Sequence, residues 1–416
     1  MNILWVCNSV LPEAAELLGL DKLPFGGWFV SVSSLLACLE DISLSIAFPQ
    51  LGFSKIKRLD GEKITYYVFP PYLPKSKGKS DIKEIIEHVR PEIIHIFGTE
   101  YPHSLEALRS ADLNRCVVNI QGLTSILQRH YFAGLPSGLL KRQTLRDFIK
   151  RDSITKQKER FERQGASEIE ALKTAKHVIG RTTWDLACVK QINPQINYHF
   201  CSEILREEFY KHRWDLNNCL RYSVFTSQGS YPVKGLHFLL EAMPIVLRSF
   251  PQVRLYVGGY DITRDVKIKD KLRISSYGKY LRGLIKKLGL KENVIFTGVL
   301  DEKTMCDRLL KSNVFVSPST IENESNSLSE AKIMGVPCVA SFVGGVTDRI
   351  EHGVDGFFYQ HDAPYMLAFY ICRIFESDAL ALTLSENAIK SAQAVNNADE
   401  NLNRLLCIYK QVLHRA

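Results

Sequence analysis

The sequence predicts an α/β fold of two domains, each built on a parallel sheet that helices cover on both faces. Its 416 residues suit two large domains or three small ones. Apolar residues make up 45% and charged residues 24%, which is typical of globular proteins and excludes disordered, collagen-like and coiled-coil chains. Short, continuously apolar runs alternate with helical patterns, and such runs are typical of strands buried on both faces of a parallel sheet.

The first half opens with a β-branched, apolar run, and a glycine pair precedes the first helical pattern. Two later apolar runs are bounded by proline or glycine, as buried strands commonly are. We therefore predict residues 1–205 as an N-terminal Rossmann-like domain. Its predicted strands are Ile3–Cys7, Ile93–Phe97 and Cys116–Ile120, and its first helix is Trp28–Leu39.

The second half repeats the alternation more regularly, so we predict residues 206–395 as a second Rossmann-like domain. Residues 396–416 are predicted to form a last helix, because the apolar side chains from Leu402 to Leu413 have near-helical spacing. The strands predicted in this half are Val224–Ser227, Val253–Val257, Val294–Thr297, Val314–Ser317 and Val336–Ala340, and the helices are Gly235–Phe250 and one that begins near Asn326.

Net charge, cysteine spacing and the length of apolar runs limit which ligands and which cellular location the sequence suggests. The net charge of +8 is too small to indicate nucleic acid, and it suits a polyanionic small ligand or an anionic membrane surface. None of the ten cysteines has CxxC spacing, so no zinc or thioredoxin-type site is predicted. No apolar run reaches 18 residues, and Met1–Asn8 lacks the basic start of a signal peptide. We expect a cytoplasmic protein.

The segment 141–163 differs from the rest, with nine basic and four acidic residues. Leu145, Phe148 and Ile149 share one helical face within it. A basic amphipathic helix is the usual form of a peripheral membrane contact, here with an anionic surface at the inner membrane face. The alternative is a helix that simply faces water.

The chemistry is concentrated between Pro318 and Gly356. A strand, a polar loop and a helix that begins near Asn326 follow one another here, and the amides of a helix N-terminus form an anion site. Glu322 lies in the loop and Glu330 about one turn into the helix. A carboxylate beside a phosphate would be repelled, so we expect Glu330 to accept hydrogen bonds from neutral hydroxyls, such as the vicinal diol of a ribose.

These residues resemble a known signature. Glu322 and Glu330, with seven residues between them, resemble the Glu-x7-Glu motif of retaining glycosyltransferases of family 4. That family has the GT-B fold of two Rossmann-like domains with an interdomain cleft. The resemblance is dense over 222–360 and thinner over 1–205. Its further matches are Lys234-Gly235 with Glu241-Ala242, Phe296-Thr297-Gly298, Gly335-Val336-Pro337, Gly344-Gly345, His352-Gly353 with Gly356, and the loop Gly26-Gly27.

The resemblance implies a role for each matching residue. Glu330 would bind the nucleotide ribose, Glu322 the hydroxyls of the donor sugar, and Lys234 the diphosphate. Groups of this kind stabilise the charge on a departing nucleoside diphosphate, so Glu322 and Lys234 are the predicted catalytic residues. The predicted donor-binding residues are Glu330, Lys234, Ser230, the helix-start residues Asn326, Ser327 and Leu328, and Gly298 and Val299 against the base.

Two positions depart from the family pattern. Gly229 stands where the family usually has an arginine, and Gln121 where its first domain often has a histidine. Both departures, together with the segment around Gly98–Ser104, resemble a subset of bacterial exopolysaccharide or capsule-type transferases. The candidates for the acceptor side or the phosphate loop are Gly26, Gly27, Trp28, Thr99, Glu100, His103, Gln121 and Arg181.

The resemblance implies retaining transfer of a sugar from a UDP- or GDP-sugar to a glycan or lipid-linked glycan, in polysaccharide biosynthesis. It also implies that the last helix returns to the first domain. No Asp-x-Asp pair occurs, so no metal and no other cofactor is expected. A catalytically degenerate binding or scaffolding subunit is the alternative. A dinucleotide-dependent oxidoreductase would need a G-x-G-x-x-G motif, which the sequence lacks.

Overall fold

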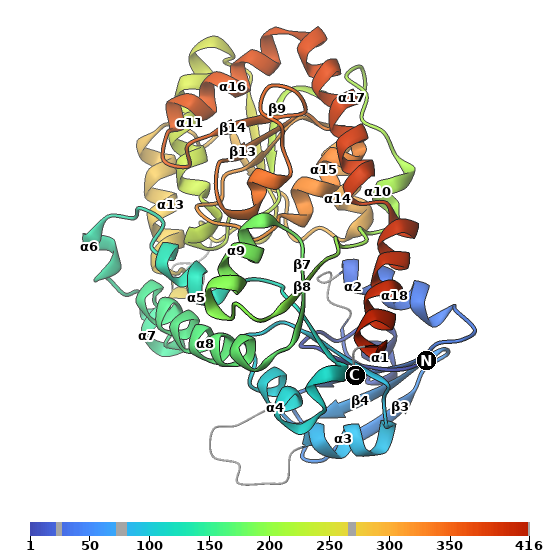
Figure 1. The fold of residues 1–416 in the computed structure, drawn as a ribbon. Coiled ribbons are helices and arrows are strands. Elements are labelled where there is room, and N and C mark those ends of the chain that lie inside the picture. The colour runs from blue at the N-terminus through green and yellow to red at the C-terminus, as the bar shows by residue number, and fades with distance from the viewer. Residues whose placement is uncertain (22–26, 72–80, 265–271, 415–416) are drawn as a thin grey trace. The chain divides into compact units, whose positions relative to one another are not determined.

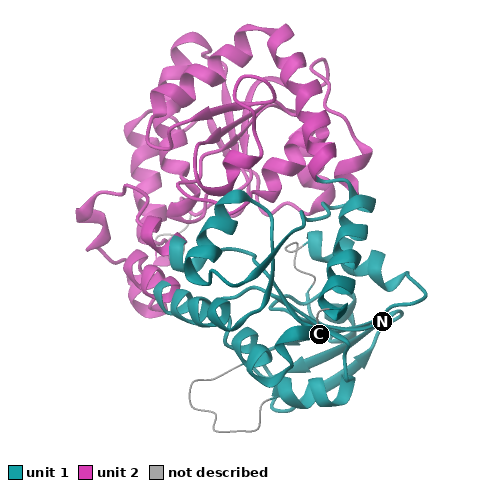
Figure 2. Cartoon of the chain, viewed as in Figure 1, with its two compact units in different colours: residues 1–126, 162–206, 396–416 teal, residues 127–161, 207–395 magenta. Residues whose placement is uncertain are grey.

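The computed structural model describes residues 1–21, 27–71, 81–264 and 272–414 (Figure 1). The chain divides into two compact units, coloured separately in Figure 2. Unit 1 comprises residues 1–126, 162–206 and 396–416, and unit 2 comprises residues 127–161 and 207–395. Each unit is a parallel or mostly parallel sheet with helices, so the predicted α/β class is confirmed.

Unit 1 is built on an eight-stranded sheet in the order β3-β4-β2-β1-β5-β6-β7-β8. All neighbouring pairs are parallel except β3 and β4. Every residue of β5 is buried, because helices cover both faces, and β5 has the predicted bounds. The strands are β1 (Asn2–Val6), β2 (Ser43–Pro49), β3 (Lys57–Asp60), β4 (Ile64–Phe69), β5 (Ile93–Phe97), β6 (Cys116–Asn119), β7 (His177–Gly180) and β8 (Asn197–Phe200).

Unit 2 is built on a six-stranded, fully parallel sheet in the order β11-β10-β9-β12-β13-β14. The predicted strands of this half all form, with ends shifted by a few residues. The strands are β9 (Leu220–Thr226), β10 (Arg254–Val257), β11 (Val294–Phe296), β12 (Ser312–Ser317), β13 (Cys338–Ser341) and β14 (Phe357–Tyr359).

The strand orders indicate where in each sheet a ligand would be expected to bind. Ligands of parallel α/β sheets bind outside the carboxyl ends of the strands, where the strand order reverses. In unit 2 the order reverses at β9 and β12, and in unit 1 at β1 and β5. The loops that follow β9 and β12 contain Lys234 and Glu322, and the loop that follows β5 contains Thr99 and Glu100.

The helices cover both sheets, and none among the described residues is both long and apolar enough to span a membrane. Those wholly in unit 1 are α1 (Pro12–Leu17), α2 (Gly27–Ala37), α3 (Asp81–Val89), α4 (Pro102–Ser110), α9 (Thr183–Ile192) and α18 (Ala398–His414). Those in unit 2 are α6 (Ser137–Leu140), α7 (Leu145–Lys150), α10 (Glu208–Lys211), α11 (Leu236–Ser249), α13 (Ser276–Lys287), α14 (Glu302–Leu310), α15 (Asn326–Met334), α16 (Pro364–Glu376) and α17 (Asp378–Val395), while α5 (Thr124–Leu127) and α8 (Ile154–Thr174) cross the division.

The last helix, α18, belongs to the core of unit 1. Its Tyr409 is fully buried, and its hydroxyl accepts a hydrogen bond from Trp5 Nε1 at 3.1 Å. The same hydroxyl lies 2.7 Å from Nδ1 of His95, whose pKa burial lowers to about 3, so the imidazole is neutral. The C-terminal residues therefore complete the hydrophobic core that β1 and β5 begin.

Tyr409→Phe should lower the free energy of unfolding by about 2–4 kcal/mol, because Trp5 and His95 each lose a buried hydrogen-bond partner. Urea unfolding of the variant and of wild type measures this loss. Tyr365→Phe, which removes an exposed hydroxyl, is the matched control and should stay within about 0.5 kcal/mol of wild type. Equal stabilities of the two variants would contradict the bonding role of Tyr409.

The segment Leu127–Phe161 departs from the predicted division, which placed all of 1–205 in one domain. It belongs to unit 2, because its contacts lie there. His237 Nε2 is 2.8 Å from the carbonyl oxygen of Ala133, and the Ser276 amide donates to Asp147 Oδ2 at 2.8 Å. A crossover between two strands of the first sheet thus packs on the second.

The predicted single amphipathic helix within 141–163 is also wrong. The segment forms α7 and the first part of α8, separated by a short break. Thr144 and Asp147 form a capping box that begins α7, and Arg151, with a left-handed φ of 50°, ends it. The predicted apolar face, Leu145, Phe148 and Ile149, therefore lies on a six-residue helix of its own.

Candidate functional site

The site in unit 2 centres on an ion pair between Lys234 and Glu322. Lys234 ends a short 3-10 helix after β9, and Glu322 lies in the loop after β12. The Lys234 ammonium donates to both carboxylate oxygens of Glu322, at 2.8 and 2.9 Å. The two side chains are 20% and 13% exposed, so the pair is partly shielded but reachable from solvent.

The Lys234 side chain stays protonated and positively charged. Burial alone would lower the pKa of this ammonium, but the neighbouring Glu322 carboxylate and Tyr231 hydroxyl outweigh burial and raise the pKa above its usual value. The Tyr231 ring also lies 5.9 Å from Lys234 Nζ. A carboxylate has about four lone-pair sites, so Glu322 retains capacity for a polar ligand, whereas a ligand that accepts a hydrogen bond from Lys234 would take over a donor now shared with Glu322 or Tyr231.

The helix α15 begins beside this loop and carries the predicted anion site. Ser325 caps it, accepting from the Leu328 amide at 3.4 Å. Ser227, the first residue after β9, donates to the Ser327 hydroxyl at 2.8 Å and thus ties the β9 loop to the first turn of α15. The partial positive charge of this nine-residue helix is therefore directed to the carboxyl ends of β9 and β12.

Glu330 lies on α15, one turn after the helix start, and its side chain is buried. This position puts it on the same element as the predicted anion-binding amides of Asn326, Ser327 and Leu328. Gly298 and Val299 follow β11, where the Gly259 amide donates to the Gly298 carbonyl at 2.9 Å. Ser230 is exposed, and its hydroxyl lies 3.5 Å from Gln228 Nε2.

Two buried ion pairs hold the loops around α15. Arg349 donates to Glu324 at 2.6 Å, and Lys332 donates to Asp355 at 2.7 Å. Glu324 lies two residues after Glu322 and could have taken its place in the motif. It is instead paired with Arg349. Sequence reasoning did not identify these pairs, because partners about 25 residues apart leave no local pattern.

Two glycines allow the loops of this site to touch. A Cβ on Gly235 would lie 1.8 Å from the Pro318 carbonyl oxygen, and one on Gly344 would lie 2.0 Å from the Glu322 carbonyl oxygen. Both glycines have positive φ, 66° and 50°. The Lys234 turn and the turn at Gly344, which follows β13, can each approach the Glu322 loop this closely only because neither glycine has a side chain.

Gly235→Ala should therefore lower the free energy of unfolding by about 1–3 kcal/mol more than Gly289→Ala does. Gly289 is the matched control, since its φ of 71° imposes the same backbone strain but no atom lies within 4 Å of its added Cβ. Thermal or urea unfolding of both variants measures the difference. If both variants lose equal stability, the close approach of Gly235 to Pro318 does not contribute to the free energy of unfolding.

The residues predicted for the acceptor side lie in unit 1, several of them after β5. Thr99 donates to Glu168 at 3.3 Å, and the buried Glu100 has its pKa raised to about 7, chiefly by burial. His103 is buried against Phe69 and Tyr101, and burial lowers its pKa to about 4. At neutral pH His103 is therefore uncharged.

Gln121 and Arg181 meet at the carboxyl ends of β6 and β7. Gln121 Nε2 donates to Asn119 at 2.8 Å, and the Arg181 guanidinium donates to the Gln121 carbonyl at 3.3 Å. Arg181 also forms a buried ion pair with Glu203. This pairing gives Arg181 a structural role in unit 1.

Gly27 begins α2, and Trp28 packs against Phe29 and Phe97, while Gly26 lies outside the described residues. Trp28 also lines a cavity of about 30 Å³, large enough for a water molecule. Other residues of its wall are His95, Asn119 and Glu203. Packing is thus the visible role of Trp28.

Glu168 is a buried carboxylate that sequence reasoning missed. It accepts hydrogen bonds from the amides of Thr124 and Ser125, at 2.8 and 3.0 Å, and from both hydroxyls. It thereby satisfies the first amides of α5 and fixes the chain that follows β6. Over the described parts of the chain, no group of three or more His, Cys, Asp or Glu side chains is placed to hold a metal ion.

Comparison with known proteins agrees with this geometry. Residues 215–391 match the family Glycosyl transferases group 1, so this part of the chain is similar to the domain of that family. An uncharacterized glycosyltransferase of Methanocaldococcus jannaschii is 27% identical over 177 residues. The aligned residues make up 42% of this chain and 42% of that relative, less than half of either protein.

Solved structures show the same fold over the whole chain. Sucrose-phosphate synthase from Thermosynechococcus elongatus superposes with a TM-score of 0.71 at 18% identity, covering 100% of both chains. Anabaena HepE in complex with UDP superposes with a TM-score of 0.66 at 16% identity, covering 99% of this chain and 100% of HepE. The fold is GT-B, as the sequence predicted.

Proposed function

We propose that this protein is a retaining glycosyltransferase that moves a sugar from a UDP- or GDP-sugar to a glycan or lipid-linked glycan. The observation that carries the proposal is the Lys234–Glu322 pair, which lies in the loops after β9 and β12, where the strand order of unit 2 reverses. A crevice at this point of a parallel sheet is the usual place for a nucleotide. HepE, a protein of the same fold, is described in complex with UDP and with UDP-glucose, which supports this class of donor.

Each residue then has a task in the transfer. The bond between the sugar and the diphosphate breaks as the acceptor oxygen bonds to the sugar, and negative charge grows on the diphosphate, whose departing oxygen accepts the proton that the acceptor hydroxyl loses. Lys234 and the amides that begin α15 offset this charge, while Glu330 accepts hydrogen bonds from the ribose diol. Glu322 orients Lys234 and accepts bonds from sugar hydroxyls. Because these protein groups balance the charge, we propose that the reaction needs no metal and no other cofactor.

The acceptor side and the cellular setting of the reaction are also part of the proposal. We propose that unit 1 supplies the acceptor side through the loop of Thr99 and Glu100 and through Gln121. Polysaccharide biosynthesis at the cytoplasmic face of a membrane, with the enzyme peripherally bound, is the setting that a lipid-linked acceptor would require.

A panel of UDP- and GDP-sugars tests the proposal. Incubation with the correct donor should release the nucleoside diphosphate slowly, since water can replace the acceptor, and NMR should show the first sugar released with the donor's anomeric configuration. A chelator should leave the rate unchanged. If no donor is hydrolysed or bound, the protein is a degenerate GT-B subunit and the proposed transfer is wrong.

A further inference from the structure

We propose that α7 is a membrane-insertion element that anchors unit 2 to an anionic lipid surface. Three bulky apolar side chains of this six-residue helix are exposed: Leu145 by 56%, Phe148 by 72% and Ile149 by 69%. Their spacing of three and four residues places them on one face. We call these three residues the α7 ridge.

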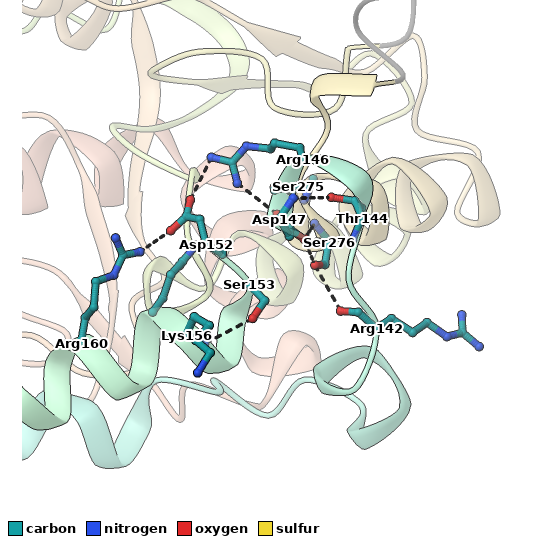
Figure 3. Close-up of polar contacts among 12 residues, drawn as sticks. Arg142, Thr144, Arg146, Asp147, Asp152, Ser153, Lys156, Arg160, Ser275 and Ser276 are labelled. Carbon is teal, nitrogen blue, oxygen red and sulfur yellow. Dashed lines mark hydrogen bonds and ion pairs between the residues drawn. The ribbon is translucent and has the colours of Figure 1, made fainter. Parts of the chain in front are cut away.

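The opposite side of α7 is fixed to unit 2, so the ridge has a defined direction. Asp147 is 1% exposed and accepts hydrogen bonds from the amide and the hydroxyl of Ser276 at the start of α13. Arg146 joins Asp147 at 3.1 Å to Asp152 at 2.9 Å, and Figure 3 shows these contacts gathered around Asp147. Rotating the ridge inward would expose Asp147 and break this network, so the ridge stays outward.

Four exposed cations flank the ridge: Lys141, Arg142, Lys150 and Arg151. Among the described residues none of them has a carboxylate partner, whereas the nearby Asp147 and Asp152 are both engaged by Arg146. In Figure 3 the Arg142 guanidinium points away from the Asp147 cluster. We call these four residues the basic collar. An apolar ridge inside a basic collar matches acyl chains below anionic headgroups.

The charge and the size of this surface favour a bilayer over a protein partner. In a symmetric dimer each surface meets its own copy, so two basic collars would repel one another. A stable protein interface also buries roughly 800 Å² on each partner, with 20 to 30 residues a side, which a single six-residue helix does not supply. A lipid surface needs only shallow insertion of a few side chains.

The inference deepens the proposed function, since it places the donor-binding unit at the surface where a lipid-linked acceptor would lie. Binding itself does not depend on turnover and is measured separately. Arg146 and Arg160 are not part of the collar, because both are engaged with Asp152.

Sedimentation of the full chain with vesicles tests the inference. Vesicles of phosphatidylcholine with about 30% phosphatidylglycerol should bind the protein at least ten-fold more tightly than pure phosphatidylcholine vesicles. Phe148→Ser with Ile149→Ser should weaken binding at least ten-fold. Replacing the four collar residues by Gln should weaken it about 100-fold or more, because each cation near such a surface contributes about five-fold.

Matched controls separate the contribution of α7 to vesicle binding from a general effect of charge or of exposed apolar side chains. Tyr365→Ser with Phe369→Ser removes two exposed aromatic side chains of α16, and Gln at Lys286, Lys287, Lys291 and Lys303 removes four exposed cations of unit 2. Both controls should bind within about three-fold of wild type, since charges beyond the Debye length are screened. Thermal unfolding should be unchanged in all variants.

Donor hydrolysis in the absence of vesicles distinguishes the two proposals. The ridge and collar variants should hydrolyse the donor at the wild-type rate. The membrane role would be overturned if vesicle binding depended neither on lipid charge nor on these substitutions. A change of oligomeric state in the ridge variant would overturn it as well. Both conclusions hold whatever the hydrolysis assay shows. Specific vesicle binding without any donor hydrolysis would overturn the proposed function and leave the membrane role standing.

Discussion

Lys234→Ala should lower turnover at saturating donor by about 100-fold, the usual loss when one group that stabilises transition-state charge is removed. Lys234 is held by both oxygens of Glu322 and keeps its proton, so it presents a fixed positive charge. Negative charge on the diphosphate grows as the sugar leaves. The affinity for the nucleoside diphosphate should therefore fall less than turnover does.

Two further variants sharpen this test. Lys303→Ala removes an exposed lysine of the same unit and should keep wild-type turnover. Lys234→Ala also leaves the Glu322 carboxylate without a counter-charge, so the double variant with Glu322→Gln shows whether that carboxylate alone causes the loss. The double variant should turn over no faster than Lys234→Ala. Recovery of turnover in it, or unchanged turnover in Lys234→Ala, would show that Lys234 does not act on the diphosphate.

Glu330→Ala should weaken nucleoside diphosphate binding by about 100-fold or more. Two ribose hydroxyls would lose a charged acceptor, each such bond contributing about 1.5–3 kcal/mol, and 1.4 kcal/mol corresponds to ten-fold in affinity. Calorimetric titration of UDP and GDP into wild type and variant measures the loss. Glu386→Ala, which removes an exposed carboxylate of α17, is the control.

A nucleotide analogue isolates the ribose contact. Wild type should bind a 2′,3′-dideoxy nucleoside diphosphate about as weakly as Glu330→Ala binds the natural nucleotide, and the variant should lose little further affinity for the analogue. Glu330→Gln keeps the shape of this buried side chain and guards against a folding defect. Independent, additive losses from the substitution and the analogue would mean that Glu330 does not contact the ribose.

The sequence predicts the parts of this protein whose signals are local. The buried strand β5 has its predicted bounds because four of its five residues are apolar and the fifth, His95, is buried with them. The family resemblance implies that Lys234 and Glu322 bind parts of one donor, and in the structure the Lys234 ammonium lies 2.8 Å from a Glu322 carboxylate oxygen. Parallel strands deliver the loops at their carboxyl ends to one edge, so such pairs follow from the strand order.

Several of the parts that were not predicted depend on contacts between distant residues. Asp147 and Ser276 are 129 residues apart, and their bond helps to hold the segment 127–161 on unit 2. The short β14 and the ion pairs of Glu324 and Lys332 likewise have no periodic pattern. A break of three residues after Lys150 divides the predicted basic helix, and only the capping geometry reveals it.

The central claim is that unit 2 binds the donor nucleotide through α15 and Lys234, and a crystal structure with UDP or GDP bound tests it most directly. We expect the ribose hydroxyls to lie within hydrogen-bond distance of the Glu330 carboxylate, and the diphosphate to lie between the Lys234 ammonium and the amides of residues 326–328. A nucleotide bound away from these groups, or a site that stays empty at saturating nucleotide, would contradict it.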